Sequence, residues 1–312
     1  MREYVIDSRS SGMRLSRFVE KTAPSLPVSG LYKAIRTRRI KLNGKRCRPE
    51  DRLTEGDVVQ LWLDESSFEN RSLPDFMRAS ADLTVLYEDA DTAVLYKPQG
   101  LSSHPYAGEY SDNLVARFLR HMYENGEYDP EAGGSPPALC NRLDRNTEGI
   151  VLAGKNHEAV KAINSLIKNG SIRKTYLAVT VSSPPEDGIY EAWLLKDEKK
   201  NIVKVRSDEK EGWQKIITEF RTVSEKNGLW LVECILHTGR THQIRAHLSF
   251  LGAPILGDVK YGDRDANRRY GAKRQMLTAY SIQIPQTGIP ALAGISGKIF
   301  RLNDKPYRDM FS

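Results

Sequence analysis

The stretch Asn141-Arg142-Leu143-Asp144-Arg145-Asn146-Thr147-Glu148-Gly149 leads directly into the apolar run Ile150-Val151-Leu152-Ala153. The apolar run is typical of a buried strand, so we expect Asp144 to lie on a loop that enters a strand. Its two arginine neighbours favour the charged form of this carboxylate and can hold it in place. A nucleophile or a base needs both properties, although a loop aspartate that pairs with adjacent arginines for structural reasons has the same pattern.

The segments around this stretch indicate a domain in which helices and loops flank a large sheet. Apolar runs or alternation predict strands at 83–87, 92–96, 176–181, 215–223 and 229–236. Apolar residues at helical spacing predict helices at 113–122 and 157–168. We therefore expect an α+β domain whose sheet is mixed or antiparallel.

Residues 12–64 have the pattern of a separate, small α/β domain. Its first half contains apolar residues at helical spacing, and its second half indicates short strands around the turn Asn43-Gly44. The polar, aperiodic residues 65–81 then predict a linker. This division leaves residues 82–312 for the larger domain.

The net charge of the chain is +7, and it is concentrated in the small domain. Between Lys33 and Arg52, nine basic residues stand against two acidic ones, so this stretch alone has a net charge of +7. A concentrated basic patch attracts a polyanion because binding releases counterions, which predicts contact with nucleic acid. A basic helix face that is merely solvated is the alternative. The candidates for this contact are Lys33, Arg36, Arg38 and Arg39.

Composition and spacing argue against several other classes of protein. With 39% hydrophobic and 28% charged residues, the 312-residue chain resembles an ordinary soluble globular protein. It has no run of about 18 apolar residues and no apolar signal core, so we expect a cytoplasmic protein without membrane contact. Three widely separated cysteines predict reduced thiols. The histidines at 237, 242 and 247 lack zinc-motif spacing and no phosphate-binding loop occurs, so neither a metal nor a nucleotide cofactor is expected.

The segment Asn141–Gly149 resembles the His-Arg-Leu-Asp-x-x-Thr-Ser-Gly signature of the RluA family of RNA pseudouridine synthases. Blocks at 86–105 and 237–262 resemble two other conserved segments of that family, and Arg173-Lys174-Thr175-Tyr176-Leu177 lies between them in the family's order. Residues 12–64 are similar to the alpha-L RNA-binding motif, which is often fused ahead of such catalytic domains. The resemblance implies the pseudouridine synthase fold with an N-terminal RNA-binding domain.

The resemblance also implies an activity, the isomerisation of specific uridines to pseudouridine in structured RNA. Large-subunit ribosomal RNA is the expected target in preference to transfer RNA, and we expect a monomer. The reaction breaks the bond from uracil nitrogen 1 to the ribose, turns the base and rejoins it through carbon 5, without a cofactor. The alternative is a non-catalytic RNA-binding or ribosome-assembly factor that retains the fold. An RNA methyltransferase is not expected, because the sequence lacks a glycine-rich loop for a methyl donor.

The catalytic residues that the resemblance implies are Asp144, Tyr176 and Arg245. Asp144 would add covalently to the ribose or the base, or abstract a ribose proton, and the sequence leaves these routes open. Tyr176 would stack on the flipped base, although a tyrosine that only fills the core is the alternative. Arg245 would pair with Asp144 and keep it ionised, while Arg240 could take that part or contact phosphate.

Further substrate-binding residues follow from the matching blocks. Arg142 corresponds to a residue implicated in opening the RNA and filling the space that the flipped base leaves. Lys97, Lys174 and Arg240 are the other candidates, although Lys97 could instead have a plain structural role.

The signature departs from the family's pattern at two positions. Asn141 replaces the usual histidine, and we expect it still to form a hydrogen bond that holds the loop. Glu148 replaces the usual serine and places a second carboxylate near Asp144, where it would disturb the site if it pointed inward. We expect Glu148 to point outward.

Overall fold

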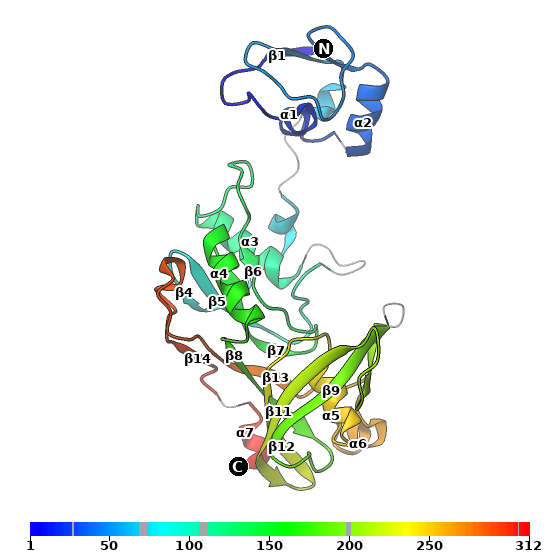
Figure 1. Ribbon diagram of the computed structural model, residues 1–312, viewed down its shortest axis with the longest axis vertical. Helices are drawn as coiled ribbons and strands as arrows, with labels where there is room; N and C mark the ends of the chain where they lie inside the picture. Colours follow the sequence, from blue (N-terminus) through cyan, green and yellow to red (C-terminus); the bar gives the residue numbers. More distant parts are fainter. Residues whose placement is uncertain (27, 69–73, 106–111, 198–200, 305) are drawn as a thin grey trace. The chain divides into compact units, whose positions relative to one another are not determined.

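The chain divides into two units, Met1–Pro74 and Asp75–Ser312, each with its own sheet and hydrophobic core (Figure 1). The computed structural model describes residues 1–26, 28–68, 74–105, 112–197, 201–304 and 306–312. The division falls inside the predicted linker 65–81, of which residues 69–73 lie outside the described part. The rest of this interval contains two short 3-10 helices, η1 (Glu65–Ser67) in the first unit and η2 (Asp75–Arg78) in the second.

The first unit combines two helices with a three-stranded antiparallel sheet. Its strands have the order β1 (Arg2–Val5), β3 (Val58–Leu61), β2 (Ile40–Leu42), and its helices are α1 (Leu15–Thr22) and α2 (Val28–Arg36). Leu15 and Val19 are one helical turn apart and fully buried, because both face the core that also contains Leu31 of α2. The strand β1 was not predicted, since its residues are mostly exposed and lack apolar alternation.

The second unit is built on a sheet of eleven strands within the described residues (Figure 1). The strands are β4 (Thr84–Glu88), β5 (Thr92–Lys97), β6 (Ala138–Leu139), β7 (Glu148–Gly154), β8 (Arg173–Thr180), β9 (Gly188–Asp197), β10 (Ile202–Arg206), β11 (Gln214–Lys226), β12 (Leu229–Leu236), β13 (Leu277–Gln283) and β14 (Ile299–Arg301). The main path has the order β10-β9-β11-β12-β8-β13-β7-β5-β4, with β14 beside β13 and β6 beside β7. All neighbours are antiparallel except β13 and β7. The predicted mixed sheet is confirmed.

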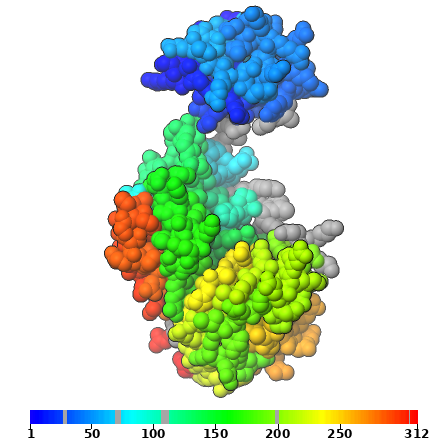
Figure 2. All heavy atoms as spheres, in the orientation of Figure 1, coloured from blue at the N-terminus to red at the C-terminus, as the bar shows by residue number. Residues whose placement is uncertain are grey.

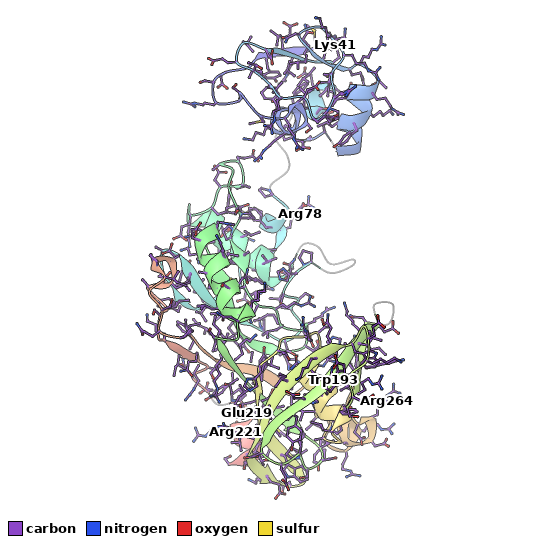
Figure 3. The ribbon with its side chains drawn as sticks, viewed as in Figure 1. Lys41, Arg78, Trp193, Glu219, Arg221 and Arg264 are labelled. Carbon is purple, nitrogen blue, oxygen red and sulfur yellow. The ribbon has the colours of Figure 1, made fainter. Side chains whose placement is uncertain are left out.

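Helices pack on this sheet and along its edges. They are α3 (Leu114–Glu124), α4 (His157–Lys168), α5 (Gln243–Phe250), α6 (Arg264–Arg269) and α7 (Arg308–Phe311), with a 3-10 helix η3 at Pro290–Leu292. The first two begin at Asn113 and Asn156, whose side chains accept hydrogen bonds from backbone N–H groups in the first turn. Helix α4 packs against β7 and η3. Figure 2 shows the green atoms of the α4 region beside the orange atoms of the η3 region. Helix α5 packs against β10 and β11, and α6 begins at Arg264 (Figure 3).

Strand β13 brings together two segments that are distant in the sequence. Its residue Ala279 pairs with Tyr176 of β8 on one side and with Gly149 of β7 on the other. Gly149 has a φ of +120°, and a Cβ atom there would lie 2.2 Å from the Ala279 carbonyl oxygen, so only glycine fits this close approach. The loop that carries Asp144 directly precedes β7, as predicted, and it is therefore held near Tyr176.

Candidate active site

A cavity of about 590 Å³ lies where the loop before β7, the first half of β8 and the segment leading into α5 meet. Six of the predicted site residues line it: Arg142, Asp144, Lys174, Tyr176, Arg240 and Arg245. Asp144 is the single acidic residue among the described residues that line the cavity. The basic lining includes Lys168 at the end of α4, which the sequence did not single out because an exposed lysine at a helix end has no distinctive pattern.

The Asp144 carboxylate is held by a buried arginine that two aspartates share. Arg245 Nη1 donates to Asp144 Oδ2 at 2.7 Å, while its Nε and Nη2 donate to the two oxygens of Asp258 at 2.6 and 3.0 Å. Asp258 is 1% exposed. Burial alone raises the pKa of Asp258, but the hydrogen bonds and charge of Arg245 outweigh it and hold this pKa below its usual range. Because Asp258 already compensates one positive charge, Asp144 keeps a net negative charge in the shared group.

Tyr176 lies in the wall of the cavity and is also part of the hydrophobic core of the sheet. It is 7% exposed. Burial, together with the negative charge of Asp144, raises its pKa, so the phenol stays protonated at neutral pH. Tyr176 is thus both a core residue and a residue of the cavity wall, so the two interpretations from the sequence, a stacking residue and a core residue, are compatible.

The other cavity residues supply positive charge without competing carboxylates. Arg142 and Arg240 are exposed. Lys174 is half-buried, and burial lowers the pKa of its amine. Among the described contacts, Lys174 has no ion pair, so its ammonium is available to a phosphate group.

Lys97 requires a correction, because it does not contact the cavity. Its side chain is completely buried, and its Nζ donates to the backbone carbonyls of Pro98, Leu101 and Arg145 at 2.9, 2.7 and 3.1 Å. The sequence prediction of a substrate-binding lysine is wrong, since no substrate can reach this amine. Burial lowers the pKa of Lys97 to about 7, although the charges of Asp144 and Glu148 oppose that shift. Its bond to Arg145 ties it to the residue after Asp144.

Lys97→Met is expected to destabilise the second unit by about 2–4 kcal/mol, because three buried carbonyls lose their donor. Turnover should fall while RNA affinity is retained, since the loop that carries Asp144 loses its anchor. Thermal unfolding and single-turnover kinetics measure the two effects, with the exposed Lys161→Met as the matched control. A variant with normal stability and weakened RNA binding would instead restore the substrate-contact role.

The two departures from the family signature have different structural roles. Asn141 Oδ1 accepts a hydrogen bond from the Leu152 backbone at 2.7 Å, which holds the loop against β7 as predicted. Glu148 accepts hydrogen bonds from Tyr96 and Thr278, both at 3.1 Å, and does not line the cavity. The expectation that Glu148 does not point into the site agrees with this arrangement, because its half-buried carboxylate is bonded to Tyr96 and Thr278 instead.

The four basic candidates of the first unit occupy one continuous segment. Lys33 and Arg36 are on α2, whereas Arg38 and Arg39 are in the turn before β2, and all four are exposed. Arg39 lies 3.9 Å from Asp64, and Lys41 of β2 lies over the Trp62 ring (Figure 3). The patch therefore exists as a surface of the first unit.

Within the described residues, no group of three or more histidine, cysteine, aspartate or glutamate side chains is placed to hold a metal ion. The helices of the described segments are all too short or too polar to cross a membrane.

Comparison with known proteins identifies the family of this chain. Residues 91–250, just over half of the chain, match the family model described as RNA pseudouridylate synthase. The chain belongs to this family. Residues 13–59 match the S4 domain, and the predicted resemblance to RluA-type synthases with an N-terminal RNA-binding module is confirmed. Membership supports the predicted enzyme over the non-catalytic binding factor.

Relatives within the RNA pseudouridylate synthase family cover most of the chain. Ribosomal large subunit pseudouridine synthase C of Vibrio cholerae is 31% identical and covers 89% of this chain and 87% of its own. Synthase D of Xanthomonas campestris is 29% identical, over 94% of this chain and 88% of its own. The structure of human RNA pseudouridylate synthase domain containing 4 superposes with a TM-score of 0.54 at 24% identity, over 72% of this chain and 89% of that one, which supports the fold.

Proposed function

We propose that this RNA pseudouridine synthase acts on uridines of large-subunit ribosomal RNA and that Asp144 is its catalytic carboxylate. One observation carries the assignment of Asp144: it is the single described acid in a basic cavity, paired with Arg245 and close to Tyr176. The relatives named for the large ribosomal subunit support the choice of ribosomal over transfer RNA.

The cavity fits a nucleotide that has been turned out of the RNA. Its volume of about 590 Å³ is in the usual range for small-ligand sites. Tyr176 offers an aromatic wall on which the uracil can stack, a contact worth about 1–3 kcal/mol. Asp144 then assists cleavage of the bond from nitrogen 1 to the ribose by adding to ribose or base or by taking a ribose proton, and the base rejoins through carbon 5.

The cations of the cavity are assigned to the RNA backbone. Arg240 and Lys174 contact phosphates that flank the target, because both lack carboxylate partners among the described contacts. Arg142, exposed and two residues before Asp144, fills the position that the flipped base leaves. These contacts position the substrate, while Asp144 performs the chemistry.

Tritium release from RNA labelled at uracil carbon 5 tests the proposed function. Ribosomal RNA that lacks the modification and transfer RNA are compared, with wild-type protein and Asp144→Asn side by side. Release from ribosomal RNA by wild type alone is the expected result. Release from transfer RNA alone would overturn the target, and no release from either would overturn the activity.

The basic patch of the first unit supplies a second testable expectation. Replacing Arg36, Arg38 and Arg39 by glutamine should weaken RNA binding and lower the slope of log affinity against log salt by about 2–3, because three phosphate contacts are lost. Turnover at saturating RNA should remain. The control replaces Arg78, Arg206 and Lys215 of the second unit by glutamine, which removes the same charge outside the patch. Equal slopes for the two triple variants would place the RNA contact elsewhere.

We also infer that the enzyme works as a monomer in the cytoplasm. Its exposed large apolar side chains, such as Val5, Ile189, Val259 and Ile299, come from separate elements. Light scattering after size exclusion measures the state directly, and a mass of twice the chain's would contradict the monomer.

A further inference from the structure

The Asp144 carboxylate has a second polar neighbour, His242. This residue directly precedes α5, has a left-handed φ of 55° and is 9% exposed. Its ring lines the cavity, and its Nε2 lies 3.7 Å from Asp144 Oδ2. A non-glycine residue with this backbone conformation is uncommon and is retained where the surroundings fix it.

The hydrogen bonds of Tyr261 favour one position of the His242 proton. The Tyr261 hydroxyl accepts a hydrogen bond from the Val203 backbone at 2.7 Å, so its own hydrogen is free to donate. The atom available to accept it is His242 Nδ1, at 2.9 Å. When the tyrosine donates in this bond, Nδ1 is the acceptor and the imidazole proton is on Nε2, which faces Asp144.

The surroundings keep this imidazole neutral. Burial lowers the pKa of His242 to about 4, helped by the charges of Arg245 and Lys260 and opposed by Asp144 and Asp258. Around the ring, Arg245 belongs to α5, Asp258 and Lys260 belong to the turn after residue 257, and Asp144 belongs to the loop before β7. At neutral pH His242 therefore offers Asp144 an N–H dipole and no charge.

Both polar neighbours face the same oxygen of the carboxylate. Arg245 donates to Oδ2 at 2.7 Å, and His242 Nε2 is nearest to that atom. In the described contacts Oδ1 accepts no hydrogen bond. We propose that His242 is a positioning residue whose Nε2–H closes onto Asp144 Oδ2 when RNA fills the cavity, so that Oδ1 is the reacting oxygen. The inference rests on the proposed function of Asp144.

The separation of His242 Nε2 from Asp144 Oδ2 fits a site to which no substrate is bound. A distance of 3.7 Å is too long for a hydrogen bond. In free enzymes such bonds are often long and shorten only in the complex with substrate. A donor that closes on Oδ2 would fix the rotation of the carboxylate and stabilise its charged form.

Variants at position 242 test this inference. His242→Ala should lower the single-turnover rate by about 10–100-fold, while the Kd for RNA changes less than about twofold. His242→Gln should recover most of the rate, because its amide N–H can reach the same carboxylate. The control is His121→Gln. It removes a histidine of α3 that pairs with Glu88 of β4, outside the cavity.

The results that overturn the inference are specific. A wild-type single-turnover rate in His242→Ala, or a change confined to RNA affinity, would exclude the positioning role. Nitrogen NMR of the wild-type histidine rings at neutral pH tests it without any variant. A protonated Nδ1 on His242 would also overturn it, whether or not the alanine variant folds. If the wild-type protein released no tritium, the proposed function would be refuted instead. Failure of the proposed function and failure of the inference about His242 can therefore be told apart.

Discussion

Asp144→Asn is expected to lower the rate of tritium release by at least about 10⁴-fold, the largest effect of any single substitution in this protein. Asparagine has the shape of aspartate but no charge, so it can neither add to the substrate nor take a proton. RNA affinity should remain close to that of the wild type, because the proposed phosphate contacts come from the basic residues of the cavity and of the first unit.

The control for this substitution is a second aspartate that pairs with an arginine. Asp208 pairs with Arg206 and does not line the cavity. Asp208→Asn should leave release unchanged. Comparable release by wild type and Asp144→Asn would show that Asp144 does not carry out the reaction. Because no other described acid lines the cavity, a group other than a cavity carboxylate would then be responsible.

Arg245→Met is expected to have the second-largest effect, with turnover lowered by about 10²–10³-fold and the second unit destabilised by about 3–5 kcal/mol. Methionine fills much of the volume but removes the charge that Asp144 and Asp258 share. Asp258 would then be a completely buried carboxylate without a cation. Urea unfolding followed by tryptophan fluorescence measures the stability change, because Trp193, Trp213 and Trp230 all lie in the second unit.

The destabilisation should depend on pH in a defined direction. The pKa of Asp258 is lowered in the folded protein, so the pair with Arg245 contributes stability above the ordinary pKa of an aspartate. That contribution is lost as the pH falls through the folded value. The difference between wild type and Arg245→Met should therefore be larger at about pH 7 than at about pH 2, which lies below the ordinary pKa of an aspartate. The double variant Arg245→Met, Asp258→Asn should regain part of the stability but none of the activity, and an equally unstable double variant would contradict the shared-pair account.

Local patterns in the sequence were sufficient for much of the fold. The apolar run after Asp144 predicted β7, and helical spacing predicted α3 and α4 to within a few residues. These elements each present one buried face or a continuous buried run, which local periodicity records. Strands β9, β10 and β13 were not predicted, and neither was α5. From Gln243 to Leu248 every residue of α5 is buried, so no amphipathic stripe marks this helix.

The sequence by itself determined the family and the RNA-binding module, and it singled out Asp144, Tyr176 and Arg245 as candidates, because their motifs are contiguous and distinctive. Only the tertiary structure decided that Lys97 anchors a loop, that Asp258 shares Arg245 with Asp144 and that His242 faces the same carboxylate. The last two contacts depend on β13, which lies between β7 and β8 and pairs with both. They also depend on α5, whose Arg245 reaches Asp144 although the two residues are 101 positions apart in the chain. Such contacts arise from pairing between distant segments, which no local spacing of residues encodes.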